Sequence, residues 1–192
     1  MKEDRVGKTR VLVLIDWYLP GYKAGGPIQS VVNLVSQLKG TINFSIVTSD
    51  SDFGDADSYP GIQLDQWIEE DNQVQILYLS KKNQSLRGLK RIINPNEYDY
   101  IYLNSMFSYR FTILPLLAFN SSSAKIVLAP RGMLGEGALG IKPMKKKIFM
   151  RLARFTGIYD NVLWQATNAA ESDDIISMLG ENAKVTLVSN IP

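Results

Sequence analysis

The chain has 192 residues, enough for one domain with a substantial core, and its contents of 45% hydrophobic and 21% charged residues are ordinary globular values. It has no cysteine, which excludes disulfides and thiolate metal sites, and no histidine, which removes the commonest general base and metal ligand. The formal net charge of +2 gives no indication of nucleic acid binding, and no apolar run approaches the roughly 20 residues of a membrane span. The first residues are too charged for a signal peptide, so a cytoplasmic protein is expected.

The first predicted elements are a strand, a loop with glycines, and a helix. Residues 11–17 are apolar except for Asp16 and show no polar alternation, which is typical of a strand buried on both faces of a parallel sheet. Residues 28–38 place their apolar side chains at helical spacing, and Pro27 suits the first position of that helix. The apolar helix positions are Ile28, Val31, Val32, Val35 and Leu38.

Gly25 and Gly26 stand where this strand leads into the helix amino terminus. Glycines at such a turn let a ligand approach the backbone, and the free N–H groups of the first helical turn favour an anion. Glycine pairs also make simple tight turns, so a ligand site and a plain bend both stay open. The spacing fits neither the dinucleotide fingerprint nor the P-loop, because Pro27 and Ile28 stand where the P-loop needs a lysine and a hydroxyl residue.

The middle of the chain continues the alternation of strands and helices. Strands are predicted at residues 43–48, 74–78, 100–103 and 125–129, and helices at residues 85–93 and 111–119. The acidic stretch 49–61 begins like a calcium-binding loop, but it lacks the terminal glutamate and the flanking helices of that motif. A solvated loop that borders the site is therefore expected there.

Polar residues follow two of these strands at the carboxyl edge, where open α/β sheets bind their ligands. Asn104 and Ser105 come directly after one predicted strand, and Arg131 and Gly132 lie in the turn after the next. The guanidinium of Arg131 can bind a phosphate or carboxylate in a bidentate manner, or it can form a structural ion pair. Asn104 can contact a ligand or satisfy its own turn, and these alternatives stay open.

A basic helix is predicted from Lys142 to Arg154. Four apolar residues share one face of it, and packing of that face on the sheet is favoured. The face comprises Met144, Ile148, Leu152 and Phe155. The basic residues would then be a solvated face, and contact with an anionic membrane is the alternative. The residues considered for that membrane contact are Lys142, Lys145, Lys146 and Arg151.

The last predicted elements are strands at residues 161–166 and 184–188, with a helix at 169–179 between them. Thr167 or Asn168 is expected to cap this helix, and Glu171 stands at the spacing of a capping box. Thr167 and Glu171 are interpreted as structural caps first and site residues second. The whole pattern predicts a three-layer α/β/α Rossmann-like domain with a mostly parallel sheet of about seven strands.

Two long motifs carry a resemblance to a known family: LPGYKAGGPIQSVVNL at residues 19–34 and APRGMLGEGALGIKP at residues 129–143. They resemble the amino-terminal domain of retaining GT-B glycosyltransferases of the group called family 4 or group 1. The resemblance covers nearly the whole chain. It implies that residues 1–192 are one acceptor-binding domain, and that the carboxyl-terminal donor-binding domain is absent from this chain.

The resemblance also implies the chemistry. Such enzymes transfer a hexose from a nucleotide-sugar donor to a glycan or lipid-linked acceptor, generally without a metal or other cofactor. Gly25 and Gly26 would face the donor diphosphate. The residues that would line the acceptor side are Asp16, Asn104, Ser105, Arg131 and Gly132. Related transferases commonly carry a histidine where Asn104 stands, so no catalytic residue is assigned.

The donor-binding motif of the family, two glutamates eight positions apart, does not occur in this chain. The chain alone is therefore expected to be inactive. A stand-alone Rossmann-like ligand-binding or regulatory module is the alternative function.

Overall fold

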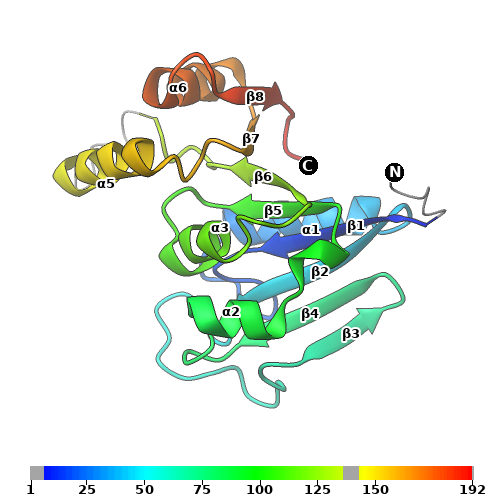
Figure 1. Ribbon diagram of the computed structural model, residues 1–192. Coiled ribbons are helices and arrows are strands. Elements are labelled where there is room, and N and C mark those ends of the chain that lie inside the picture. Colours follow the sequence, from blue (N-terminus) through cyan, green and yellow to red (C-terminus); the bar gives the residue numbers. More distant parts are fainter. Residues whose placement is uncertain (1–6, 136–142, 192) are drawn as a thin grey trace.

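The protein is described by a computed structural model that covers residues 7–135 and 143–191, and for residues 143 and 145–147 the backbone alone. Eight strands form one sheet in the order β3-β4-β2-β1-β5-β6-β7-β8 (Figure 1). Every neighbouring pair is parallel except β3 and β4. The expected α/β Rossmann-like fold is confirmed, with one strand more than predicted.

Strands and helices alternate along most of the chain. The strands are Thr9–Leu14 (β1), Ile42–Ser49 (β2), Trp67–Asp71 (β3), Val74–Leu79 (β4), Tyr100–Asn104 (β5), Lys125–Ala129 (β6), Val162–Ala166 (β7) and Lys184–Leu187 (β8). The α-helices are Gly26–Leu38 (α1), Leu86–Ile92 (α2), Leu114–Ala118 (α3), Pro143–Thr156 (α5) and Ala169–Leu179 (α6). Short helical turns cover Pro95–Glu97 (η1) and, with π-helical geometry, Tyr109–Ile113 (η2).

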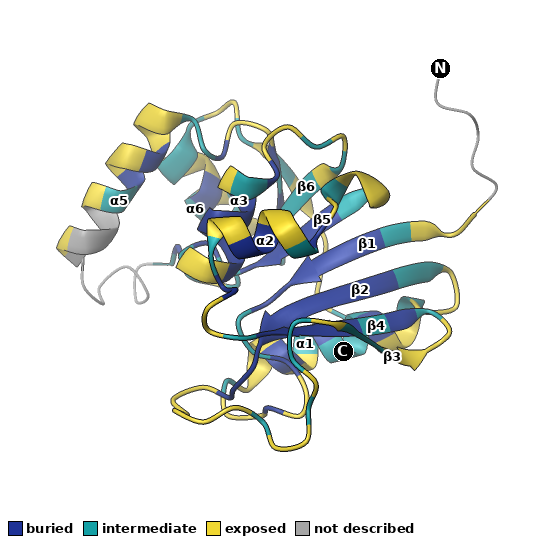
Figure 2. Cartoon of the chain, turned by 60° about the horizontal axis from the view of Figure 1, so that its bottom comes forward, coloured by how far each residue is buried: buried dark blue, intermediate teal, exposed yellow. Residues whose placement is uncertain are grey.

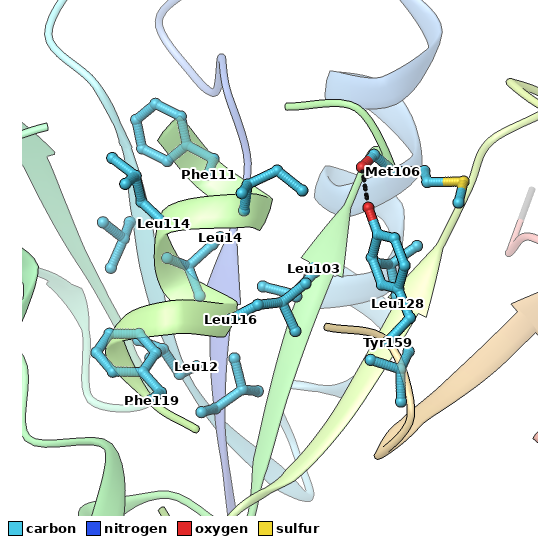
Figure 3. Packing of buried hydrophobic residues seen from close by; sticks show 14 of the residues in the cluster. Leu12, Leu14, Leu103, Met106, Phe111, Leu114, Leu116, Phe119, Leu128 and Tyr159 are labelled. Atoms are coloured by element: carbon cyan, nitrogen blue, oxygen red, sulfur yellow. Dashed lines mark hydrogen bonds between the residues drawn. The ribbon is translucent and has the colours of Figure 1, made fainter. Parts of the chain in front are cut away.

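Two apolar clusters fill the two sides of the sheet. On one side α1 packs through Val31 and Val35, which are buried against β1, β2 and β4. The other side is covered by α2, α3, α5 and α6, and Figure 1 shows α2 and α3 in front of the sheet with α1 behind it. Figure 3 shows this second cluster, in which Leu12 and Leu103 of the strands lie against Leu116 of α3. Helices therefore flank the sheet on both sides, as the apolar strand runs predicted.

β3 is the strand that the sequence analysis missed. It pairs antiparallel with β4 at the edge of the sheet, and its last three residues are exposed. Strands are predicted from apolar alternation, and this edge strand has little of it. Two of the misplaced strand ends bear on the site. β1 ends at Leu14 and not at residue 17, and Asn104 is the last residue of β5 rather than the first residue after it.

α5 packs through a different face from the one predicted. The buried positions are Met150 and Ala153, and Phe149 is partly buried against the same core. The four apolar residues expected to lie on the sheet are all exposed: Met144, Ile148, Leu152 and Phe155. The prediction that this face packs on the sheet is therefore wrong.

Candidate functional site

A pocket of about 210 Å3 opens at the carboxyl edge of the sheet. Asp16 comes shortly after β1, Asp50 directly after β2, and Arg110 from the turn η2 that follows β5, and all three line the pocket. β2, β1 and β5 are adjacent parallel strands, so their carboxyl ends bring these distant segments together. The pocket thus lies at the edge where a sheet of this kind binds its ligand.

Asp16 is held in place by Ser108, whose hydroxyl donates to Oδ1 at 2.7 Å. Burial raises the pKa of the Asp16 carboxyl above its usual value, although the Ser108 hydrogen bond and the positive charge of Arg110 act against that rise. Arg110 is fixed in turn by Gln84, whose Oε1 accepts from Nη1 at 2.8 Å. The pocket wall is therefore built from side chains that hold one another.

Asp50, which lines this pocket, has a hydrogen-bond acceptor without a partner among the described residues. The residue is only 3% exposed, and its Oδ2 accepts from the Ser58 hydroxyl at 3.0 Å. Its buried Oδ1 has no partner among the described residues. A buried carboxylate oxygen without a partner is costly, so this atom indicates a place for a hydrogen-bond donor.

Asp52 ties the loop after β2 to the loop after β1. Its carboxylate accepts from the backbone N–H groups of Tyr22 at 3.0 Å, Lys23 at 3.2 Å and Phe53 at 2.7 Å. Burial pushes the pKa of Asp52 upward, but these three N–H donors outweigh it and the pKa lies below its usual value. Asp52 therefore stays charged and anchors the segment that carries the glycines.

The acidic stretch after β2 is exposed over most of its length and borders the pocket, as expected, but its start is buried. Asp50, Ser51 and Asp52 are buried at its start, while Asp55 and Asp57 are exposed. In the part of the chain that the structure describes, no group of three or more acidic side chains is arranged to hold a metal ion. Asp50, Gln84 and Arg110 line the pocket but were not among the predicted site residues. The same holds for Ser108, which holds Asp16 in place.

The two glycines before α1 differ in what the fold requires of them. Gly25 has φ 64° and ψ −119°, a conformation that only glycine adopts readily. A Cβ on Gly26 would meet nothing within 4 Å, and its N–H has no partner among the described residues. Pro27 lies in the first turn of α1, as predicted. Since Pro27 has no N–H and the Ile28 N–H already donates to Gly25 at 3.1 Å, Gly26 is the donor left in that turn.

Arg131 lies across the carboxyl ends of β5 and β6. Its Nη2 donates to Tyr102 Oη at 3.0 Å and to Asn104 Oδ1 at 2.8 Å, and its Nη1 donates to Asn190. It forms no ion pair with a carboxylate within the ranges described, so the structural pair weighed for it is replaced by three neutral partners. Asn104 is buried, and its Nδ2 has no partner among those residues.

Two residues without a glycine's freedom adopt left-handed backbone conformations at this edge. Ser105 has φ 102° and Arg131 has φ 56°. The Ser105 N–H donates to the carbonyl of Ala129 at 3.0 Å, which joins the ends of β5 and β6. Backbone conformations of this kind are unfavourable and often occur at binding sites.

Glu171 joins the turn after β6 to the turn after β7. One carboxylate oxygen accepts from the Gly132 N–H at 2.7 Å, and the other accepts from the Thr167 N–H at 2.8 Å and hydroxyl at 2.7 Å. Burial acts to raise the pKa of Glu171, but these donors and the charge of Arg131 lower it overall. Asn168 is the residue that caps α6, by accepting from the Glu171 N–H at 2.9 Å.

The predicted acceptor-side residues fall into two groups in the structure. Asp16 lines the pocket with Asp50, whereas Asn104, Ser105, Arg131 and Gly132 form the hydrogen-bonded edge of β5 and β6. Of the residues considered for membrane contact, Lys142 lies outside the described residues, and Lys145 and Lys146 have only their backbone described. Arg151 is exposed on α5. The structure describes no helix that is long and apolar enough to cross a membrane.

Several solved structures are similar to this chain in fold. The chain is similar to sucrose-phosphate synthase from Thermosynechococcus elongatus, with a TM-score of 0.59 and 10% identity over 95% of this chain and 48% of that one. It is similar to Anabaena HepE in complex with UDP and glucose, with a TM-score of 0.59 and 14% identity over 95% of this chain and 44% of that one. A UDP-forming α,α-trehalose-phosphate synthase from Burkholderia vietnamiensis has a TM-score of 0.53 and 13% identity over 90% and 43% of the two chains.

No protein-family model matches the sequence, and a search of curated proteins finds no match. The identities to the solved structures are low, so these structures define the fold and not the activity. The chain covers most of its own length in each comparison but less than half of each of the three matched chains. It therefore has the Rossmann-like fold of one half of a GT-B glycosyltransferase.

Proposed function

We propose that this chain is the acceptor-binding domain of a retaining glycosyltransferase, which transfers a sugar from a nucleotide-sugar donor to a glycan or lipid-linked acceptor. The observation that carries the proposal is the match of nearly the whole chain to less than half of HepE, which was solved with UDP and glucose. A second domain would hold the donor across the cleft, and the chain would be inactive without it. The rate gained by positioning donor and acceptor together depends on both halves of the cleft.

The pocket between Asp16 and Asp50 is the proposed site for the acceptor sugar. A sugar hydroxyl that reaches Asp50 can donate to its unpaired Oδ1 and can accept from the Arg110 guanidinium, which lines the same pocket. The pocket holds more carboxylates than basic groups, which favours an uncharged polyhydroxyl group over a phosphate. In this assignment Asp16 contacts the acceptor, in keeping with its predicted role.

The edge formed by Asn104, Ser105, Arg131 and Gly132 has a second proposed role on the acceptor side. The unpaired Nδ2 of Asn104 can donate to the acceptor, while Arg131 is already bonded through Asn104, Tyr102 and Asn190. In this role Arg131 positions Asn104 rather than binding a phosphate itself.

Gly26 is the proposed contact to the donor diphosphate, with Gly25 shaping the turn that presents its N–H. In an enzyme that contains both domains, Gly26→Val is expected to reduce transfer by at least about tenfold, because it covers the N–H that would meet the phosphate. Its melting temperature should stay within a few degrees, since an added side chain at Gly26 points into open space. If the variant were as active as the wild type, the turn would be a plain bend without a contact to the donor.

The acceptor site can be tested on this chain by ligand-detected NMR with methyl glucoside, methyl galactoside and methyl mannoside. Asp50→Asn should weaken binding of the sugar that the protein prefers by about tenfold or more, which is the effect of losing a hydrogen bond to a charged group. Asp57→Asn, in the same loop but exposed, is the matched control and should bind like the wild type. If the Asp50 variant bound the sugar as tightly as the wild type, this pocket would not be the acceptor site.

The alternative is a stand-alone ligand-binding or regulatory module with the same fold. The length of the reading frame distinguishes the two functions. The transferase is supported if the reading frame continues beyond Pro192 into a domain of similar size with two glutamates eight positions apart. A stop codon at that point would support the module.

A further inference from the structure

The outward side of α5 carries an apolar surface that nothing in the described chain covers. Its four side chains, Met144, Ile148, Leu152 and Phe155, have exposed fractions of 73%, 57%, 58% and 89%. Their spacing of four, four and three residues places them along one side of the helix. We call them the outward stripe. Large apolar side chains gathered on one exposed face mark an interaction site more often than isolated ones do.

The opposite side of α5 attaches the helix to the domain without using the outward stripe. Met150 and Ala153 are buried, and the Phe149 ring packs edge-on against Phe107 and Tyr159, with centroid distances of 5.5 Å and 6.5 Å. The Tyr159 hydroxyl in turn donates to the Met106 carbonyl at 2.8 Å (Figure 3). Figure 2 shows buried and exposed positions alternating along α5, as expected for a helix with one side on the domain. The fold therefore needs no contact from the outward stripe.

The charge of α5 is of one sign. Its sequence contains three consecutive lysines, Lys145–Lys147, and two arginines, Arg151 and Arg154, and no acidic residue. Positions 147, 151 and 154 follow one another at helical spacing and form a row beside the outward stripe. Arg151 and Arg154 are exposed. An apolar stripe with a basic row beside it is the pattern of a helix that lies in the interface of an anionic membrane.

Other occupants fit this pattern less well. A second copy of the chain would bring two basic helices face to face, and like charges oppose such a contact. A protein partner would have to bury Arg151 and Arg154 beside the outward stripe, and burying a charge is costly unless it is paired. A bilayer takes up the apolar side chains at its acyl boundary while its headgroups pair with the basic ones, so it satisfies both features at once.

We propose that α5 binds an anionic lipid bilayer, with the outward stripe at the acyl boundary and Arg151 and Arg154 at the headgroups. The proposal rests on α5 and not on the acceptor pocket. It would fail if the second domain of the proposed transferase covered the outward stripe, so the product of the full reading frame must bind the vesicles as well.

The test is co-sedimentation of the chain with vesicles of equal parts phosphatidylglycerol and phosphatidylcholine, with pure phosphatidylcholine vesicles for comparison. We expect binding to the anionic vesicles at about 0.05 M salt and a loss of at least about tenfold at about 0.5 M salt, because the headgroup contacts are screened. The triple variant Ile148→Ser, Leu152→Ser, Phe155→Ser should lose at least about tenfold in binding, with an unchanged or higher melting temperature.

A matched control removes exposed leucines elsewhere. The double variant Leu117→Ser, Leu187→Ser changes residues that are 46% and 59% exposed on α3 and β8, and it should bind vesicles like the wild type. The charge variant Arg151→Gln, Arg154→Gln should bind about 25-fold more weakly, since each basic residue near an anionic surface changes partitioning about fivefold. It should also show a weaker dependence on salt.

Several outcomes would overturn the proposal. One is the absence of binding to anionic vesicles at low salt, and another is binding by the triple variant that equals binding by the wild type. A lowered melting temperature of the triple variant would also overturn it, because it would mean that the outward stripe packs on protein. A dimer in size-exclusion chromatography that the triple variant dissociates would assign the outward stripe to a second copy instead.

Discussion

α1 and α5 look alike in sequence, since each has apolar residues at helical spacing and polar or charged residues elsewhere, but they use these residues in opposite ways. The apolar face of α1 is buried on the sheet through Ile28, Val31 and Val35. The apolar face predicted for α5 points to solvent, and α5 is held by Met150 and Ala153 on its other side.

The difference shows what periodicity can and cannot decide. Helical spacing tells which residues share a face, because 3.6 residues make one turn. It does not tell which of two apolar faces meets the core. α5 has two apolar faces, and the longer one is the outward stripe. The shorter one is centred on Met150, and its Phe149 ring packs against the rings of Phe107 and Tyr159.

The largest expected effect compares isoleucines of the two helices. Ile28→Ala in α1 removes a side chain that is 4% exposed and should lower the free energy of unfolding by about 2 to 4 kcal/mol. Ile148→Ala in α5 removes one that is 57% exposed and should change it by no more than about 0.5 kcal/mol. Urea unfolding of both variants measures this, and equal losses would contradict the assignment of faces.

A second comparison lies within α5 and uses its two methionines. Met150→Ala should lower the free energy of unfolding by about 2 kcal/mol, since Met150 is buried in the core that includes Leu128 and Trp164. Met144→Ala should leave it nearly unchanged, because Met144 is exposed. If Met144 proved the more sensitive position, the helix would be rotated relative to the structure described.

A smaller effect is expected at α6, whose first turn is fixed by Glu171. Glu171→Gln replaces charge-assisted hydrogen bonds to Gly132 and Thr167 and should cost about 1.5 kcal/mol at pH 7, because the amide keeps one acceptor oxygen. The folded-state pKa of Glu171 is lowered, so its stabilisation is present above the usual glutamate pKa of about 4.3 and is lost as the pH falls through the lowered value. The wild type and the variant should therefore converge in stability at acid pH.

The matched control for this prediction is Glu181→Gln, at an exposed residue after the same helix. Its stability should follow that of the wild type between pH 7 and the acid range. If the free energies of unfolding of the wild type and the Glu171 variant differed by the same amount at every pH, the stabilising role of the charged Glu171 carboxylate would be contradicted.

Local signals predicted most of the fold. β6 and α6 were predicted with both ends correct, because β6 is an apolar run followed by Pro130 and α6 begins at a capping residue and ends at Gly180. The first helical position of α1 was predicted at Pro27, one residue after the observed start at Gly26. β3 has no apolar alternation and was missed, as was the π-helical start of the helix after β5.

The candidate site depended on contacts that the sequence does not display. Ser108 reaches Asp16 across 92 positions, and Glu171 reaches Gly132 across 39. Neither pair has a local pattern. Asp50 did carry a signal, because it is a charged residue directly after a buried strand, but its burial and its unpaired Oδ1 come from the packing of Ser58 and Tyr59 around it.

The central claim is that this chain supplies the acceptor half of a transferase and has no turnover alone. The direct measurement is sugar transfer from a panel of nucleotide sugars, beginning with UDP-glucose, by the chain of residues 1–192 and by the product of the full reading frame, side by side. We expect a folded, cooperatively melting chain without transfer and a longer protein that transfers sugar from at least one donor. Measurable transfer by residues 1–192 alone would contradict the claim.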